Sequence, residues 1–174
     1  MSKHICKIYA LLLSAALVLS FVLCSCKKSE KSTYEILCGA KQQFSQYLTN
    51  VSVYDSNAEP GEAEHIDQGL IAALLGDGSE YPPQMSGCQE YSFFCASSIE
   101  VCELWIVRCR TYSCAQSVYE LFEERRNRLS KTDFENDADS LAADSAEIIK
   151  KGKTVCFAAL SCSKQALDHI CGEI

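Results

Sequence analysis

Basic side chains are scarce in this sequence. Its 174 residues include 16 Lys and Arg against 23 Asp and Glu, which gives a formal net charge of −7 at pH 7. Proteins that bind nucleic acid place Lys and Arg on the phosphates, so this charge balance excludes a nucleic-acid partner. The same acidity disfavours a domain that lies flat on an anionic bilayer.

Short motifs of known chemistry are also lacking. The chain has no C-x-x-C pair, which argues against a zinc ribbon and against a thioredoxin-type redox site. It has no G-x-S-x-G, H-E-x-x-H, P-loop or dinucleotide-binding fingerprint either. We therefore predict no catalytic residue, no cofactor and no metal site, and we prefer a non-enzymatic role to an enzymatic one.

The sequence begins with a leader. Lys3 and Lys7 form a basic segment before an uncharged stretch, 10–23, that is rich in Leu and Ala. At about 1.5 Å per residue, a helix of this length is too short to cross a hydrocarbon core about 30 Å thick. A basic segment followed by a short apolar one is typical of a signal peptide, which we place at residues 1–25.

The end of this leader, Leu23-Cys24-Ser25-Cys26, resembles the lipobox of bacterial lipoproteins. The resemblance implies cleavage before Cys26 and a diacylglyceryl thioether on its sulfur, and two or more acyl chains anchor a protein stably. We expect a membrane-anchored protein on the extracytoplasmic face of the cell membrane, with 26–33 as a polar tether and 34–174 as one domain. The alternatives are an uncleaved short membrane helix and a signal peptide cut elsewhere.

The spacing of apolar residues along the domain predicts the element order α-α-β-β-α-β-β-α. Apolar residues three and four apart indicate helices, and alternating ones indicate strands. The simplest packing is an α+β fold of two layers, an antiparallel sheet of about four strands with helices packed on it. The predicted helices are 34–48, 64–75, 113–129 and 163–171, the hairpins are 88–110 and 146–160, and the loops are 50–62 and 76–87.

Each predicted hairpin is followed by a helix. In the first hairpin Phe93 is expected opposite Leu104, and in the second Ile148 is expected opposite Val155, with Lys151-Gly152 as the tight turn. The helix after the first hairpin has a capping-box pattern and one apolar stripe. Its capping box is predicted at Ser113 to Gln116, and its buried stripe consists of Ala115, Val118, Leu121, Phe122, Arg125 and Leu129.

Cysteine is abundant, with twelve in the chain. Without Cys6, Cys24 and the lipid-bearing Cys26, nine cysteines remain in the domain. Nine is an odd number, so at least one thiol is unpaired unless two chains join.

Four of these cysteines recur every seven residues in the first hairpin. With the turn at 97–100, the predicted register sets Cys95 opposite Cys102 and Cys88 opposite Cys109. A Cys95–Cys102 disulfide is then possible if the strands close in locally. The alternative is that these cysteines are small buried apolar residues with free thiols.

Two groups of titratable residues are candidates for chemistry. Acids surround His65 before the second helix, and carboxylates with a histidine can hold a divalent metal. The alternative, which we prefer, is that acids gather there because a helix start favours negative charge. His169 and Cys162 lack the third, orienting group that a nucleophilic site needs. The acidic cluster consists of Glu59, Glu62, Glu64, His65 and Asp67.

Four segments between residues 64 and 160 form a recognisable series. They are Glu103-Leu-Trp-Ile-Val, a helix ending in Glu-Glu-Arg-Arg, Phe134, and Glu147-Ile-Ile-Lys-Lys-Gly-Lys before a hydrophobic strand. With the leader, they resemble the bacterial lipoprotein family catalogued as domain of unknown function 4358. The chain departs from the family at Thr154, where an aromatic residue is expected, and after Phe134, where a tyrosine is expected. No activity is assigned to the family, so the resemblance implies none.

The leading hypothesis is a lipid-anchored, non-enzymatic binding or interaction module whose partner, a protein or a small molecule, the sequence does not identify. If helices cover only one face of the sheet, the other face, with Trp105, Phe94 and Val107, is the expected contact surface. The alternative is an exported enzyme, or a metal or redox protein, that uses the acidic His65 loop or a free cysteine. A third interpretation is a structural spacer in the cell envelope.

Overall fold

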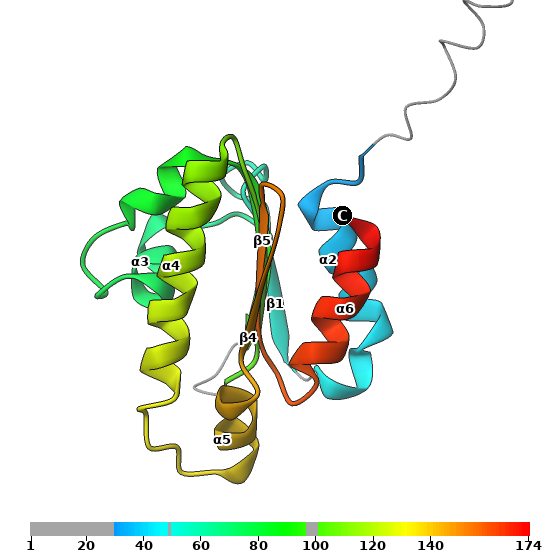
Figure 1. Ribbon diagram of the computed structural model, residues 1–174, viewed down its shortest axis with the longest axis vertical. Helices are drawn as coiled ribbons and strands as arrows, with labels where there is room; N and C mark the ends of the chain where they lie inside the picture. The colour runs from blue at the N-terminus through cyan, green and yellow to red at the C-terminus, as the bar shows by residue number, and fades with distance from the viewer. Residues whose placement is uncertain (1–29, 49, 97–100) are drawn as a thin grey trace, which may run out of the picture. The chain divides into compact units, whose positions relative to one another are not determined.

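The centre of the fold is an antiparallel sheet of five strands in the order β1-β2-β3-β5-β4. The computed structural model describes residues 30–48, 50–96 and 101–174 (Figure 1). The predicted leader, the predicted lipid site Cys26 and the predicted turn at 97–100 lie outside the described residues. The strands are β1 Val51–Asp55, β2 Cys88–Ala96, β3 Glu103–Cys109, β4 Glu147–Lys151 and β5 Thr154–Ala159.

Helices cover both faces of this sheet (Figure 1). On one face lie α3 and α4, and on the other lie α2 and α6, while α5 contacts α4 and β5 at one end of the sheet. None of the helices in the described part of the chain is long and apolar enough to span a membrane. The bounds are α2 Thr33–Gln43, α3 Gln68–Leu75, α4 Tyr112–Leu129, α5 Asp137–Asp144 and α6 Ser163–Glu173, with 3-10 turns η1 Ser45–Tyr47 and η2 Pro83–Gly87.

The predicted α+β class, an antiparallel sheet with helices packed on it, is confirmed. The structure differs in two details, because the sheet has five strands and the helices form a layer on each face. Trp105 and Phe157 belong to the core under α3 and α4, whereas Leu104 and Cys156 belong to the core under α2 and α6. Strands that are apolar on both faces need cover on both sides.

The fifth strand, β1, occupies part of the segment predicted as the loop 50–62. It is short, half-buried and at the edge of the sheet, where it pairs antiparallel with β2. Asn50, directly before it, has a positive φ of 55°, a conformation that asparagine tolerates better than most residues. A five-residue strand with half-buried side chains gives a weak alternating pattern, so the sequence favours a loop here.

The central β2–β3 hairpin has a register one residue away from the predicted one. Phe93 lies opposite Trp105 and not opposite Leu104. The two rings stack with centroids 3.8 Å apart and planes 11° apart, and such aromatic pairs add about 0.5–1.5 kcal/mol beyond their burial. A slip of one residue would send one of the two rings to the other face, so the stacked pair specifies the observed register.

The β4–β5 hairpin differs from its prediction by two residues. Its turn is formed by Gly152 and Lys153, with Gly152 at a φ of 63°, and Ile148 lies opposite Phe157 and not opposite Val155. A shift of two residues leaves every side chain on its predicted face. Ile148 therefore still packs into the same core as Phe157.

The helix termini also differ slightly from the predictions. The N-cap of α4 is Thr111, two residues before the predicted Ser113, although the predicted apolar residues of the stripe are buried. The N-cap of α2 is Ser32, which forms a capping box with Glu35. Thr33 is fully buried. Ser32 and Thr33, predicted as the end of the tether 26–33, therefore belong to the domain.

A buried ion pair joins β3 to α4. Glu103 is 3% exposed, and its Oε1 lies 2.8 Å from Nη2 of Arg125 and accepts a 3.0 Å hydrogen bond from Nε. Its other oxygen, Oε2, accepts a 2.8 Å hydrogen bond from Nε1 of Trp105. Removing one partner of a buried pair leaves an uncompensated charge in the interior.

We predict that Arg125→Met lowers the free energy of unfolding by about 3 kcal/mol, because it strands the Glu103 carboxylate. The neighbouring Arg126 is the matched control, since its pair with Glu123 is a 3.5 Å contact between side chains 39% and 40% exposed. Arg126→Met should change stability by less than about 1 kcal/mol. Urea denaturation of the three proteins measures both values, and equal losses would contradict the prediction.

Candidate functional site

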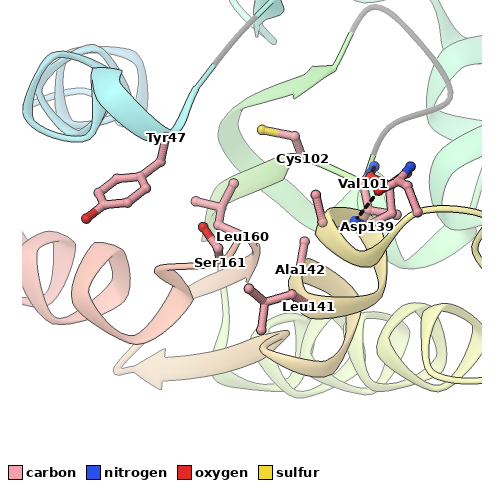
Figure 2. A pocket seen from close by; sticks show the side chains of 10 residues that line it. Tyr47, Val101, Cys102, Asp139, Leu141, Ala142, Leu160 and Ser161 are labelled. Carbon is pink, nitrogen blue, oxygen red and sulfur yellow. Dashed lines mark hydrogen bonds between the residues drawn. The ribbon is translucent and has the colours of Figure 1, made fainter.

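A groove of about 450 Å³ opens at the end of the sheet where α5 lies (Figure 2). Four separate segments build it, namely η1, the two residues before β3, α5 with the residue before it, and the loop after β5. Its volume lies within the range of small-molecule sites. Its lining consists of Tyr47, Val101, Cys102, Asn136, Ala138, Asp139, Leu141, Ala142, Leu160 and Ser161.

Two large apolar side chains stand exposed in this groove. Leu141 is 54% exposed and Tyr47 is 49% exposed, and the third such residue of the described chain, Tyr112, is 72% exposed at the start of α4. Figure 2 shows Tyr47 on one side, side chains of α5 on another, and Leu160 and Ser161 between them. Exposed apolar side chains that gather around one hollow are typical of a contact site.

Asp139 fastens α5 to the segment just before β3 and thereby fixes one wall of the groove. It is 6% exposed, and its Oδ1 accepts a 2.6 Å hydrogen bond from the backbone N–H of Val101. Its Oδ2 accepts a 2.6 Å bond from the side-chain amide of Asn136, whose oxygen caps α5 by accepting from the Asp139 N–H. Both carboxylate oxygens are thus occupied in holding the wall.

A second polar contact fixes the loop after β5. The Ser163 hydroxyl accepts a 2.8 Å hydrogen bond from the backbone N–H of Leu160 and lies 3.2 Å from the carbonyl oxygen of Ala158. Ser163 is 1% exposed, so this turn is held from inside the domain. Leu160 and Ser161 are placed in the groove by this locked turn.

The segment 133–144, which supplies half of the groove lining, is negatively charged. Residues 133–144, which include α5, contain five acids and no Lys or Arg. Four of these acids are exposed, and only Asp139 is buried. The four exposed acids are Asp133, Glu135, Asp137 and Asp144.

The contact surface predicted from the sequence is wrong. Trp105, Phe94 and Val107 are all 0% exposed, because each face of the sheet is covered by helices. Phe94 also lies on the opposite face from the other two, in the core under α2 and α6. The groove was not predicted, since its residues come from segments up to about a hundred positions apart.

The acidic cluster around His65 does not assemble into a metal site. Nδ1 of His65 lies 3.1 Å from the carbonyl oxygen of Ala58, and Asp67 accepts from the Gly69 N–H as the N-cap of α3. In residues 30–48, 50–96 and 101–174, the one group of three or more potential ligands within reach of a single ion is formed by cysteines. The local bonds and the helix cap agree with the preferred interpretation of the acids.

The other histidine considered for chemistry, His169, packs its ring edge-on against Phe44, with centroids 5.9 Å apart. Cys162 is buried at the N-cap of α6.

The predicted Cys95–Cys102 pairing is wrong. The observed register sets Cys95 opposite Glu103, so Cys95 and Cys102 lie on opposite faces of the sheet. Cys95 is a buried free thiol. The predicted pairing of Cys88 with Cys109 is confirmed, because a bulge between Cys88 and Glu90 restores their alignment.

Comparison with known proteins finds no similar one. No family model, no curated protein and no solved structure matches it.

The buried Cys95 thiol makes stability depend on pH. Burial raises its pKa from an ordinary value of 9.0 to about 11, and the Glu103 carboxylate adds to the rise. Between these values the unfolded chain loses the thiol proton while the folded chain keeps it, so the free energy of unfolding falls as pH rises. Above both pKa values, the rise in pKa would have lowered the free energy of unfolding by about 3 kcal/mol.

We predict that Cys95→Ala reduces the fall in unfolding free energy between pH 9 and pH 11 relative to the parent protein. Urea denaturation under reducing conditions at several pH values provides the measurement. The same pH dependence in both proteins would show that Cys95 does not carry the effect.

Proposed function

We propose that this chain is a lipid-anchored protein on the extracytoplasmic face of the cell membrane, with the lipid on Cys26. The support is the order of a basic segment, a short apolar segment and the lipobox-like Leu23-Cys24-Ser25-Cys26. The resemblance to the lipoprotein family catalogued as domain of unknown function 4358 supports the same assignment.

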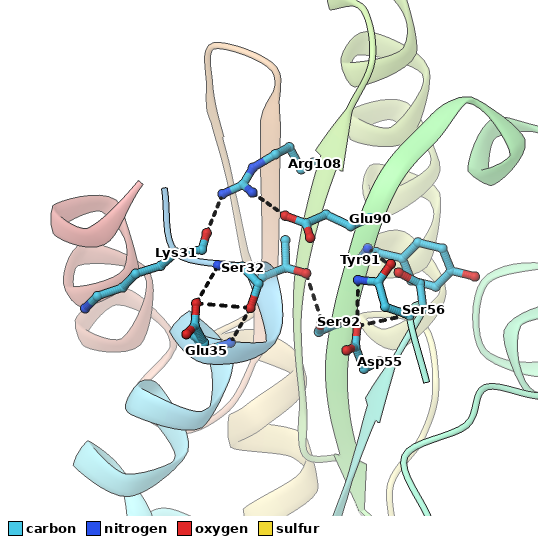
Figure 3. Close-up of polar contacts among 11 residues, drawn as sticks. Lys31, Ser32, Glu35, Asp55, Ser56, Glu90, Tyr91, Ser92 and Arg108 are labelled. Carbon is cyan, nitrogen blue, oxygen red and sulfur yellow. Dashed lines mark hydrogen bonds and ion pairs between the residues drawn. The ribbon is translucent and has the colours of Figure 1, made fainter. Parts of the chain in front are cut away.

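The fold is compatible with a short anchor. Nη2 of Arg108 donates a 3.0 Å hydrogen bond to the carbonyl oxygen of Lys31, and Nη1 of the same guanidinium pairs with Glu90 (Figure 3). The chain is therefore bound to the sheet from Lys31 onward. Five residue steps separate Cys26 from Lys31, and they can span at most about 17 Å.

The groove lies at the other end of the domain from this attachment. In Figure 1, α2 starts at the end of the sheet where the described chain begins, and α5 lies at the opposite end. An anchor at Cys26 would hold the first end near the membrane and leave the groove facing outward. This position suits the binding of a ligand from outside the cell.

We further propose that the groove binds a small ligand with an apolar body and a positively charged group. The observation that carries this proposal is the pair of exposed side chains Tyr47 and Leu141 in the groove, together with four exposed acids in the segment 133–144 that contributes to its lining. The apolar body would bury these two side chains, and the acids would attract the cation. The domain would thus act as a binding module, without catalysis.

For the anchor, we predict that Cys26→Ala abolishes acylation and moves the protein out of the lipoprotein fraction, because the sulfur carries the lipid. Cys24→Ala is the matched control and should leave acylation unchanged. Mass spectrometry of the N-terminal peptide and detergent partitioning provide the measurements. Acylation that survives Cys26→Ala would refute the assignment.

For the groove, we predict that tryptamine binds the domain more tightly than indole-3-propionate, which has the same aromatic body and the opposite charge. NMR shifts of the groove residues during titration measure both affinities.

Leu141→Ser should weaken tryptamine binding by about tenfold, because it removes most of one apolar contact. Tyr112→Ser replaces an exposed apolar residue outside the groove lining and should have no effect. Equal binding of the two indoles, or equal effects of the two substitutions, would argue against the proposal.

A further inference from the structure

Three cysteine sulfurs converge at the end of the sheet where β2 begins and β3 ends. Cys88 is the first residue of β2, Cys109 is the last residue of β3, and Cys114 lies in the first turn of α4. Their Sγ atoms all lie within 4.8 Å of one another. The three are called the thiol cluster here, and the binding groove contains none of them.

The first two sulfurs meet because of the backbone register. Cys88 lies opposite Cys109, and the Cys109 N–H points away from β2 and donates to the carbonyl oxygen of Lys153. The two cysteines therefore form a pair without direct backbone hydrogen bonds, the arrangement in which opposite Cα atoms are closest, about 4.5 Å apart. Their side chains are directed to the same face, toward α4.

The third sulfur, that of Cys114, is positioned by the short connection from β3 to α4. Thr111 caps the helix by accepting a 3.1 Å hydrogen bond from the Cys114 N–H, which fixes the first turn next to the strand ends. Gly87 leaves room for this side chain, because a Cβ atom there would lie 2.9 Å from the Cys114 sulfur. The absence of a side chain at Gly87 thus lets the cluster close.

The thiol cluster is buried but open on one side. Cys109 is 0% exposed, Cys88 is 7% exposed, and Cys114 is half-buried. A small ion can therefore approach from the side of Cys114, while the other two sulfurs form the floor.

We propose that Cys88, Cys109 and Cys114 bind a soft d¹⁰ cation, Zn²⁺ or Cu⁺, through three thiolates. Thiolates are the protein ligands that select these ions, and three protein ligands with an open fourth position are a known zinc arrangement. A metal–sulfur distance of about 2.3 Å requires sulfurs about 4 Å apart. The observed spread of up to 4.8 Å is thus within a shift of less than about 1 Å of such a site.

Binding exchanges protons for the metal. In the metal-free protein, burial raises the pKa of Cys114 to about 11, and a hydrogen bond with Cys88 together with burial raises the pKa of Cys109 further. These two thiols therefore carry protons at neutral pH, and the cation displaces them when it binds. Arg110 partly offsets the rise at Cys114, which favours the thiolate on the open side.

The test uses the full chain, purified in detergent under reducing conditions and stripped with a chelator. Zn²⁺ and Cu⁺ are titrated separately in competition with coloured chelators of known affinity, so that the two arms identify the preferred ion. We expect the protein to bind one equivalent of Zn²⁺, of Cu⁺ or of each tightly. Absorption spectra with Co²⁺ in place of Zn²⁺ should show sulfur-to-metal charge transfer.

Two substitutions test the assignment. Cys114→Ser removes one ligand from a half-buried position and should weaken binding by about a hundredfold or more. Gly87→Ala keeps all nine domain thiols, but its Cβ displaces the Cys114 sulfur, so it should also weaken binding. Cys171→Ser, a half-buried cysteine of α6 outside the cluster, is the matched control and should bind as the parent does. Circular dichroism verifies that each variant is folded.

Three results would overturn the proposal. The first is the absence of a tight equivalent of either ion in the folded parent protein. The second is equal weakening by Cys114→Ser and Cys171→Ser, which would mean unspecific binding to any thiol. The third is a Cys88–Cys109 disulfide in the protein as isolated from cells without reductant, because that bond removes two of the ligands.

Discussion

The stacking of Phe93 on Trp105 is the contact on which the rest of the fold depends. The two rings lie 3.8 Å apart in the middle of the sheet, with Tyr54 stacked on the outer side of Phe93 and Phe122 of α4 tilted against Trp105. The pair fixes which face each residue of β2 and β3 occupies. It also directs Glu103 and Cys95 to the side of α4, where Arg125 supplies the charge that a buried carboxylate needs.

Much of this fold is predictable because its signals are local. The stripe of α4, the two hairpins and the stop of α3 before Gly76 each depend on residues within one or two turns of one another. The register of the central hairpin is not local in this sense, since it is decided by a ring contact across the strands. An assumed turn at 97–100 therefore gives a register that is wrong by one residue, while the two-residue error at Gly152 leaves the faces intact.

The candidate sites also differ in whether their residues lie close together in the sequence. The acids near His65 form an obvious cluster in the sequence, but in the fold Asp67 caps a helix and Glu62 accepts from the Glu59 N–H. Local side chain to backbone bonds of this kind satisfy polar residues without creating a site. The groove beside Tyr47 and Leu141 has no sequence pattern at all, because its four segments meet only after the sheet has formed.

The thiol cluster and the attachment of the chain to the sheet share one end of β2 and β3. Glu90 lies opposite Arg108, whose guanidinium also binds the carbonyl of Lys31, and Cys88 lies opposite Cys109 just beyond them. A uniform register would satisfy only one of these two alignments. The bulge between Cys88 and Glu90 satisfies both. Movement of these strand ends would disturb both the contact of Arg108 with Lys31 and the positions of the three sulfurs. A metal ion bound in the thiol cluster should therefore also make the contact at Lys31 more rigid.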